Sequence, residues 1–112
     1  MEELHVTLYT QKSDDEFIAT FVLLWKDTKI SKFVLRGADR YGKDAWNDFI
    51  AKRVTTLLFV RGSDRYVCIS WDGANIKFEV IAEGETCGAS SKHYFPAEPM
   101  LNGLRKLAEM MN

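Results

Sequence analysis

Residues 17 to 25 read FIATFVLLW, and this stretch limits how the chain can fold. Its β-branched and aromatic residues predict a strand, which we extend back to Glu16. Alternate positions are apolar on both sides: Phe17, Phe21, Leu23 and Trp25 on one, and Ile18, Val22 and Leu24 on the other. A strand of an antiparallel sheet with one solvated face alternates apolar and polar residues. Both faces of this strand therefore need a cover.

Strand signals recur on either side of this stretch and are separated by short polar turns. The predicted strands are His5 to Gln11, Glu16 to Trp25, Ile30 to Arg36, Thr55 to Arg61, Arg65 to Trp71 and Ile76 to Ala82. Gly73 and Asn75 tolerate positive φ, so the turn before the last strand is typical of a hairpin. The alternation is lost between Glu83 and Tyr94, where we expect an irregular loop of about a dozen residues.

A helical period replaces the strand pattern between Gly42 and Arg53. Trp46, Phe49, Ile50 and Val54 fall on one face of a helix there, and Asp44 is its expected N-cap. The segment predicts a short helix with one buried side.

A second helix is predicted at the end of the chain. Pro96 and Pro99 suit its first turn, where a missing N–H costs little. The apolar stripe that follows consists of Met100, Leu104, Leu107, Ala108 and Met111. Gly103 costs a helix about 1 kcal/mol relative to alanine, so tertiary packing must hold this helix in place.

The predicted elements form three strands and a helix, followed by the same order again. We therefore expect an α+β fold with a six-stranded, mostly antiparallel meander sheet built as two strand-strand-strand-helix halves. No Pro-, Ser- or Gly-rich linker separates the halves, which predicts a single domain over residues 1–112. In architecture alone, such repeated units resemble the Whirly/PUR-type single-strand nucleic-acid binders, whose halves or subunits swap helices around a curved sheet.

A short repeat supplies the candidate site. Residues 36–46 read RGADRYGKDAW and residues 61–71 read RGSDRYVCISW, so the pattern RG-x-DRY occurs twice. Guanidinium and phenol groups on one rim suit a phosphate or a stacked base. The candidate ligand-binding residues are Arg36, Arg40, Tyr41, Arg61, Arg65, Tyr66 and Trp71. The competing interpretation is a turn in which Gly takes positive φ, Asp caps and the arginines pair locally.

Other chemistry has weaker signals. Cys87 and His93 share the predicted loop and would form a thiolate–imidazole pair in a Cys/His hydrolase, a remote alternative because no orienting third group accompanies them. Neither Cys-x-x-Cys nor His-x-x-x-His occurs, so we expect no zinc site, and no phosphate-loop glycine motif indicates a cofactor.

Charge and length favour a soluble protein of the cytoplasm. The formal net charge of the 112 residues is −1, and no basic or acidic block indicates a polyanionic partner. The start, MEELHVTLYT, lacks the pattern of a secretory signal, and the longest apolar run falls far short of the ~20 residues of a membrane helix. Cys68 and Cys87 are expected as free thiols in a reducing compartment.

Two functional hypotheses follow. The first is a non-enzymatic, homodimeric interaction module that binds or regulates another protein, because two short helices cannot cover both faces of the apolar strands. The second is a single-stranded DNA- or RNA-binding protein that uses the Arg/Tyr patch.

Overall fold

The computed structural model describes residues 4–13, 15–60, 65–82 and 89–111. Its elements run in the order β1 (Leu4–Lys12), β2 (Phe17–Trp25), β3 (Thr28–Arg36), a short 3-10 helix η1 (Ala38–Arg40), α1 (Lys43–Ile50), β4 (Thr56–Val60), β5 (Arg65–Asp72), β6 (Asn75–Ala82), β7 (Ala89–Pro96) and α2 (Ala97–Met110). The fold is α+β, and every strand pairing is antiparallel, as the sequence predicts.

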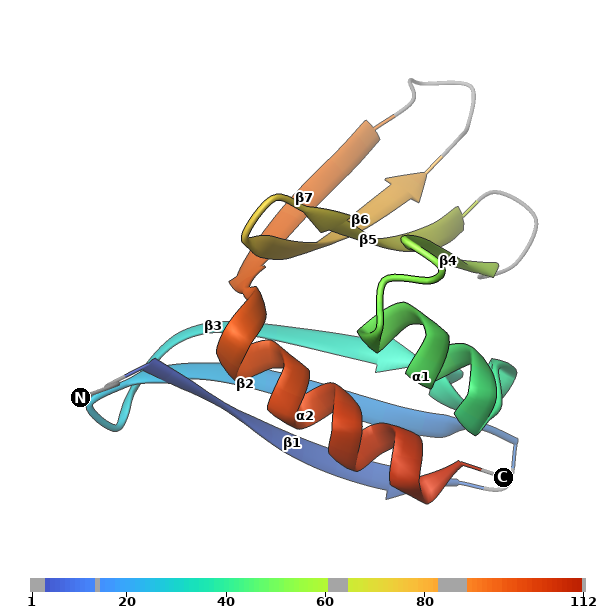
Figure 1. Ribbon diagram of the computed structural model, residues 1–112, viewed down its shortest axis with the longest axis horizontal. Coiled ribbons are helices and arrows are strands. Elements are labelled where there is room, and N and C mark those ends of the chain that lie inside the picture. Colours follow the sequence, from blue (N-terminus) through green and yellow to red (C-terminus); the bar gives the residue numbers. More distant parts are fainter. Residues whose placement is uncertain (1–3, 14, 61–64, 83–88, 112) are drawn as a thin grey trace.

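The expected single six-stranded sheet is wrong. The strands form two sheets, one with the order β1-β2-β3 and one with the order β4-β5-β6-β7. After β3 the chain leaves the first sheet through η1 and α1, and β4 then starts a new sheet instead of pairing with β3. Figure 1 shows the four-stranded sheet above the three-stranded one, with α2 crossing in front of β1 and β2 and α1 between β4 and the end of β3.

The additional strand is β7, which occupies the second half of the segment expected to be an irregular loop. Its sequence, ASSKHYFP, begins with residues of low strand propensity. Pairing with the alternating strand β6 over the whole length of β7 supplies the hydrogen bonds that its own composition does not predict.

The two sheets and both helices share one apolar core. Register places Phe21, Phe33 and Leu35 of the lower sheet on its upper face, which we call the inner face. The ring of Phe78 in the upper sheet lies 4.7 Å from that of Phe33 and 5.7 Å from that of Phe21, measured between centroids. Aromatic pairs at this distance contribute beyond the area that they bury, so these rings join the two sheets.

Helix α2 packs on the inner face over β1 and β2. Its predicted apolar stripe is buried throughout: Met100, Leu104, Leu107, Ala108 and Met111. Gly103 faces the sheet, and a Cβ built there would lie 3.4 Å from Cγ1 of Val6 and 3.6 Å from Cδ1 of Phe21. The helix therefore lies above the gap between β1 and β2.

Helix α1 is shorter than the segment that predicts it. It begins after Gly42, whose backbone is extended, and no side chain caps it, so Asp44 is a first-turn residue and not the N-cap. The helix ends at Ile50 because Lys52 adopts the left-handed conformation, with φ 63°. Neither helix in the described part of the chain is long and apolar enough to span a membrane.

Candidate binding surfaces: the outer sheet face and the β3 edge

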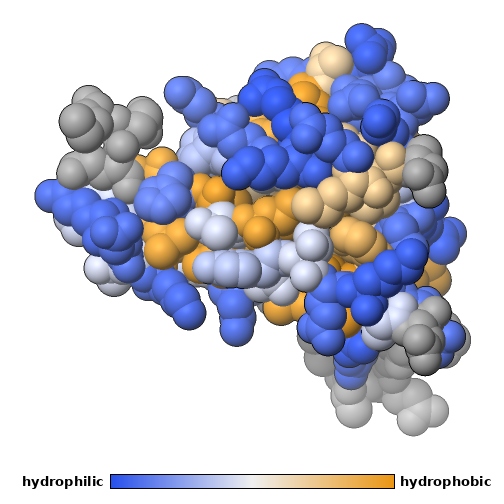
Figure 2. Space-filling view, turned by 90° about the horizontal axis from the view of Figure 1, so that it is seen from below, coloured by the Kyte–Doolittle hydropathy of each residue, from blue (hydrophilic) through white to orange (hydrophobic). Residues whose placement is uncertain are grey.

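The lower face of the three-stranded sheet, which we call the outer face, carries a band of apolar side chains. The side chains on this face come from the odd-numbered residues of β1 and the even-numbered residues of β2. The central row across the three strands consists of Tyr9, Thr20 and Val34. Tyr9 is 57% exposed and Val34 44% exposed, whereas Val22 in the next row is buried between its neighbours. Figure 2 shows this band from below, bordered by hydrophilic residues.

Most charged residues on the outer face are basic. Register places Lys29, Lys32 and Arg36 of β3 on this side, and the only acid beside them in the described ranges of these strands is Glu16, which precedes β2 and pairs with Arg36. The outer face thus combines an apolar band with a row of cations along one border.

A groove at the free edge of β3 brings together three candidate residues. Arg36, Arg65 and Tyr66 line a groove of about 370 Å³, together with Phe33, Val34, Val67 and Val80. The two RG-x-DRY segments therefore meet at the end of the molecule where β3 stops and β5 starts. Arg61 lies outside the described residues.

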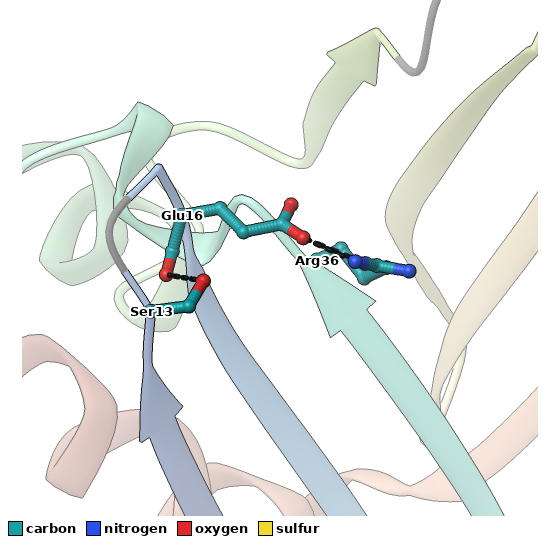
Figure 3. Close-up of polar contacts among 3 residues, drawn as sticks. All are labelled: Ser13, Glu16 and Arg36. Carbon is teal, nitrogen blue, oxygen red and sulfur yellow. Dashed lines mark hydrogen bonds and ion pairs between the residues drawn. The ribbon is translucent and has the colours of Figure 1, made fainter.

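Arg36 is already engaged by an acid. Its guanidinium forms an ion pair with the carboxylate of Glu16, and its Nε donates to Glu16 Oε1 at 2.9 Å. Figure 3 shows this pair beside the β1–β2 turn, where the Ser13 hydroxyl donates to the Glu16 carbonyl oxygen at 3.2 Å. Because more than half of the Arg36 side chain remains exposed, the pair is screened by solvent and lowers the local positive charge.

Arg40 lines a neighbouring groove of about 280 Å³ with Arg36. Asp15, Glu16 and Asp39 also line it, so acids balance the two arginines there. That second groove does not offer the clustered positive charge that a polyphosphate chain requires.

Tyr41 and Trp71 lie away from the β3-edge groove and make specific contacts with the backbone. The Tyr41 hydroxyl donates to the carbonyl oxygen of Leu58 at 2.7 Å, which satisfies an acceptor on β4. The Trp71 indole N–H donates to the carbonyl oxygen of Phe49 at 2.8 Å and joins β5 to α1. These bonds give both side chains a structural role between elements that are 17 and 22 residues apart in the sequence.

A further groove, of about 730 Å³, lies between the end of α1, the β5–β6 turn and the start of α2. Lys52, Trp71, Glu98, Leu101 and Arg105 contribute to it. The Lys52 ammonium lies 4.3 Å from the centre of a Trp71 ring, a cation–π distance.

The remaining chemical groups are dispersed. His93 lies on β7, not in a loop, with its ring 5.3 Å from that of Phe33, and Cys87 lies outside the described residues. Cys68 is a free thiol on β5, and burial raises its pKa, with Glu79 raising it further and Lys77 lowering it. Across the described ranges, no group of three His, Cys, Asp or Glu side chains is placed to hold a metal ion.

Neither a protein-family model nor a curated protein sequence matches the chain.

Sequence reasoning identified part of these surfaces. The RG-x-DRY repeat led to Arg36, Arg65 and Tyr66, which do share a groove. An uncovered sheet face was expected, because the even-numbered residues of β2 are as apolar as the odd-numbered ones, but none of its residues was among the candidate site residues. The basic border needed the register of β3 against β2, which a bulge near Leu23 and Leu24 shifts by one residue.

Proposed function

We propose that this protein is a non-enzymatic, homodimeric interaction module that binds another protein through the outer face of its three-stranded sheet. The observation that carries the proposal is the uncovered apolar band around Tyr9 and Val34. Exposed contiguous apolar surface with a polar border is typical of a protein-binding site.

The basic border indicates the chemistry of the partner. Lys29 and Lys32 lie on one side of the band, next to the Arg36–Glu16 ion pair, so a complementary surface carries an apolar strip flanked by carboxylates. Charges at the rim of an interface act chiefly on the association rate and weaken with salt, while the apolar centre supplies affinity. We therefore expect binding that slows at high ionic strength without being abolished.

The test is affinity capture with matched charge substitutions. Val34→Glu places an unpaired carboxylate in the apolar band, and Leu58→Glu places one at a similarly exposed position, 43% against 44%, on the other sheet. A partner that binds the outer face is retained by the wild type and by Leu58→Glu and lost by Val34→Glu. Equal recovery with both variants, or no stoichiometric partner with the wild type, contradicts the proposal.

A second candidate is the binding of single-stranded DNA or RNA at the β3-edge groove. It is favoured by the convergence of Arg36, Arg65 and Tyr66 beside the apolar Val34. Arginine beside an aromatic ring is the combination that holds a phosphate and a stacked base. The Glu16 carboxylate on Arg36 counts against it, since a ligand phosphate must displace that acid.

Fluorescence anisotropy with labelled oligonucleotides tests the second candidate. Binding at the groove should weaken steeply as salt increases and should fall in Arg65→Ala. Arg105→Ala is the control, because Arg105 is a basic residue of α2 that does not line this groove. Equal effects of the two substitutions would show that general charge, not the groove, accounts for any signal.

A further inference from the structure

The free edge of β1 presents unused backbone groups from its even-numbered residues. The Gly37 N–H donates to the Phe17 carbonyl oxygen, and the Ser13 N–H donates to the Glu16 carbonyl oxygen. The backbone N–H and C=O of Phe17 therefore point toward β3. Its partner on β1, Lys12, then directs its own backbone N–H and C=O away from β2, toward the free edge. Bonding alternates along an antiparallel strand, so Val6, Leu8 and Thr10 also direct N–H and C=O to the free edge.

The β1 edge lacks the protection that other edges have. The β3 edge carries Lys29 and Lys32 and contains a bulge at Ile30, and the β4 edge receives the Tyr41 hydroxyl. From Leu4 to Gln11, β1 contains no Lys, Arg, Asp, Glu, Pro or Gly. A long edge strand without such features readily pairs with another strand.

We propose that β1 pairs antiparallel with β1 of a second copy of this chain, centred on Leu8. This inference rests on the proposed function, since it supplies the site of the homodimer. A two-fold axis at Leu8 aligns the whole of Leu4–Lys12 with itself, pairing Val6 with the partner copy's Thr10 and Leu8 with Leu8. Residues with free backbone groups then meet each other, because the register keeps even positions opposite even positions.

The position of α2 suits this arrangement. The axis of α2 lies above the gap between β1 and β2, since Gly103 faces Val6 of β1 and Phe21 of β2. Strands are ~4.8 Å apart. The two-fold axis lies half a spacing to one side of β1 and α2 half a spacing to the other, so α2 is ~5 Å from the axis and the two α2 helices are ~10 Å apart. That separation is within the range at which helices pack.

Charges on α2 are complementary to themselves across the axis. From Val6 to Leu8 a strand advances ~7 Å, which equals four to five helical residues, so the axis passes close to Leu107. Helix positions at equal distances on either side of the axis face each other. Arg105 of one copy therefore lies opposite Glu109 of the other, and Glu109 of the first copy lies opposite Arg105 of the second. Both side chains are exposed and line a groove of about 550 Å³ with His5, Val6, Thr7 and Leu8.

Amide hydrogen exchange provides the first test. At high protein concentration the amides of Val6, Leu8 and Thr10 should become protected, whereas at low concentration they should exchange as free edge groups. The amides of Thr7 and Tyr9 should stay protected throughout, since they bond to β2. Fast exchange of the even-numbered amides at every concentration overturns the proposal.

A charge swap distinguishes a second copy from any other occupant. Arg105→Glu and Glu109→Arg should each weaken self-association about tenfold, since each replaces two symmetric ion pairs with like charges. Mixing the two variants restores opposite charges across the axis, so they should form a heterodimer in sedimentation velocity. Failure of the mixture to associate better than either variant alone overturns the pairing.

The same experiments separate this inference from the proposed function. Val34→Glu on the outer face should leave the β1 dimer intact. A monomer at all concentrations that still captures its partner refutes the β1 edge and the homodimeric state but not the outer face, whereas a β1 dimer that captures nothing refutes the outer face alone.

Discussion

Replacing Gly103 with alanine should stabilise the protein, although this residue of α2 is buried against the sheet. The Cβ of an alanine there would lie 3.4 Å from Val6 Cγ1 and 3.6 and 3.7 Å from the Phe21 ring, all ordinary van der Waals distances. The methyl group therefore fits without moving α2 away from the sheet.

The magnitude follows from two terms of the same sign. Alanine is favoured over glycine by about 0.8–1 kcal/mol in a helix interior. Burial of one further carbon adds up to about 0.8 kcal/mol, partly offset by the imperfect fit of the surrounding groups. We expect Gly103→Ala to raise the free energy of unfolding by about 1 kcal/mol, which corresponds to about 4 °C in Tm for a domain of this size.

Urea denaturation followed by tryptophan fluorescence measures the effect, because Trp46 is fully buried beside the core. Gly103→Val is the matched comparison: its two extra methyl groups must displace Val6 or Phe21, and overpacking of this kind costs about 1–3 kcal/mol. A loss of stability in Gly103→Ala would show that α2 lies closer to the sheet than described and would refute the reasoning.

Three further predictions concern the contacts described above. Tyr41→Phe leaves the Leu58 carbonyl oxygen without its donor and should cost about 0.5–1.5 kcal/mol in urea denaturation, whereas Tyr94→Phe at a 47% exposed position should cost almost nothing. Phe78→Ala removes the ring that joins the two sheets and should cost about 3–5 kcal/mol, and a loss below 1 kcal/mol would contradict the shared core. Because burial raises the pKa of Cys68, less thiolate is present at mildly alkaline pH in the folded state. Labelling in a Cys87→Ser background should therefore be slower than in denaturant, and Glu79→Gln should accelerate it.

The sequence predicts the strands and helices better than it predicts their assembly. The apolar run of β2, the alternation of β6 and the helical stripe of α2 are strong signals, and the structure confirms these three elements. Strand β7 escaped prediction because its stability comes from pairing with β6 and not from its own residues. The division into two sheets depends on whether β4 returns to the edge of β3, and no local pattern encodes that choice.

The sequence predicts the candidate site only in part, as it does the fold. A repeat reveals that Arg36, Arg65 and Tyr66 have similar local settings, and the structure places them in one groove. It does not reveal that the Tyr41 hydroxyl bonds to the edge of β4, because that contact depends on where a strand seventeen residues away ends up. Side-chain direction at a turn follows from tertiary neighbours, which identical turn sequences need not share.

The alternation of odd- and even-numbered residues along β1 connects the outer face with the proposed dimer edge. Even-numbered residues direct their backbone groups to the free edge, and odd-numbered residues direct their side chains to the outer face. Pairing about Leu8 therefore places Thr7 beside the second copy's Tyr9 and joins two outer faces into one continuous surface. A partner with two complementary strips gains from effective concentration when it binds such a dimer. Main-chain groups form the dimer edge, whereas side chains form the docking face, so substitutions can disrupt one without the other. A variant that no longer dimerises should lose avidity for a partner with two strips but should keep single-site binding at Val34.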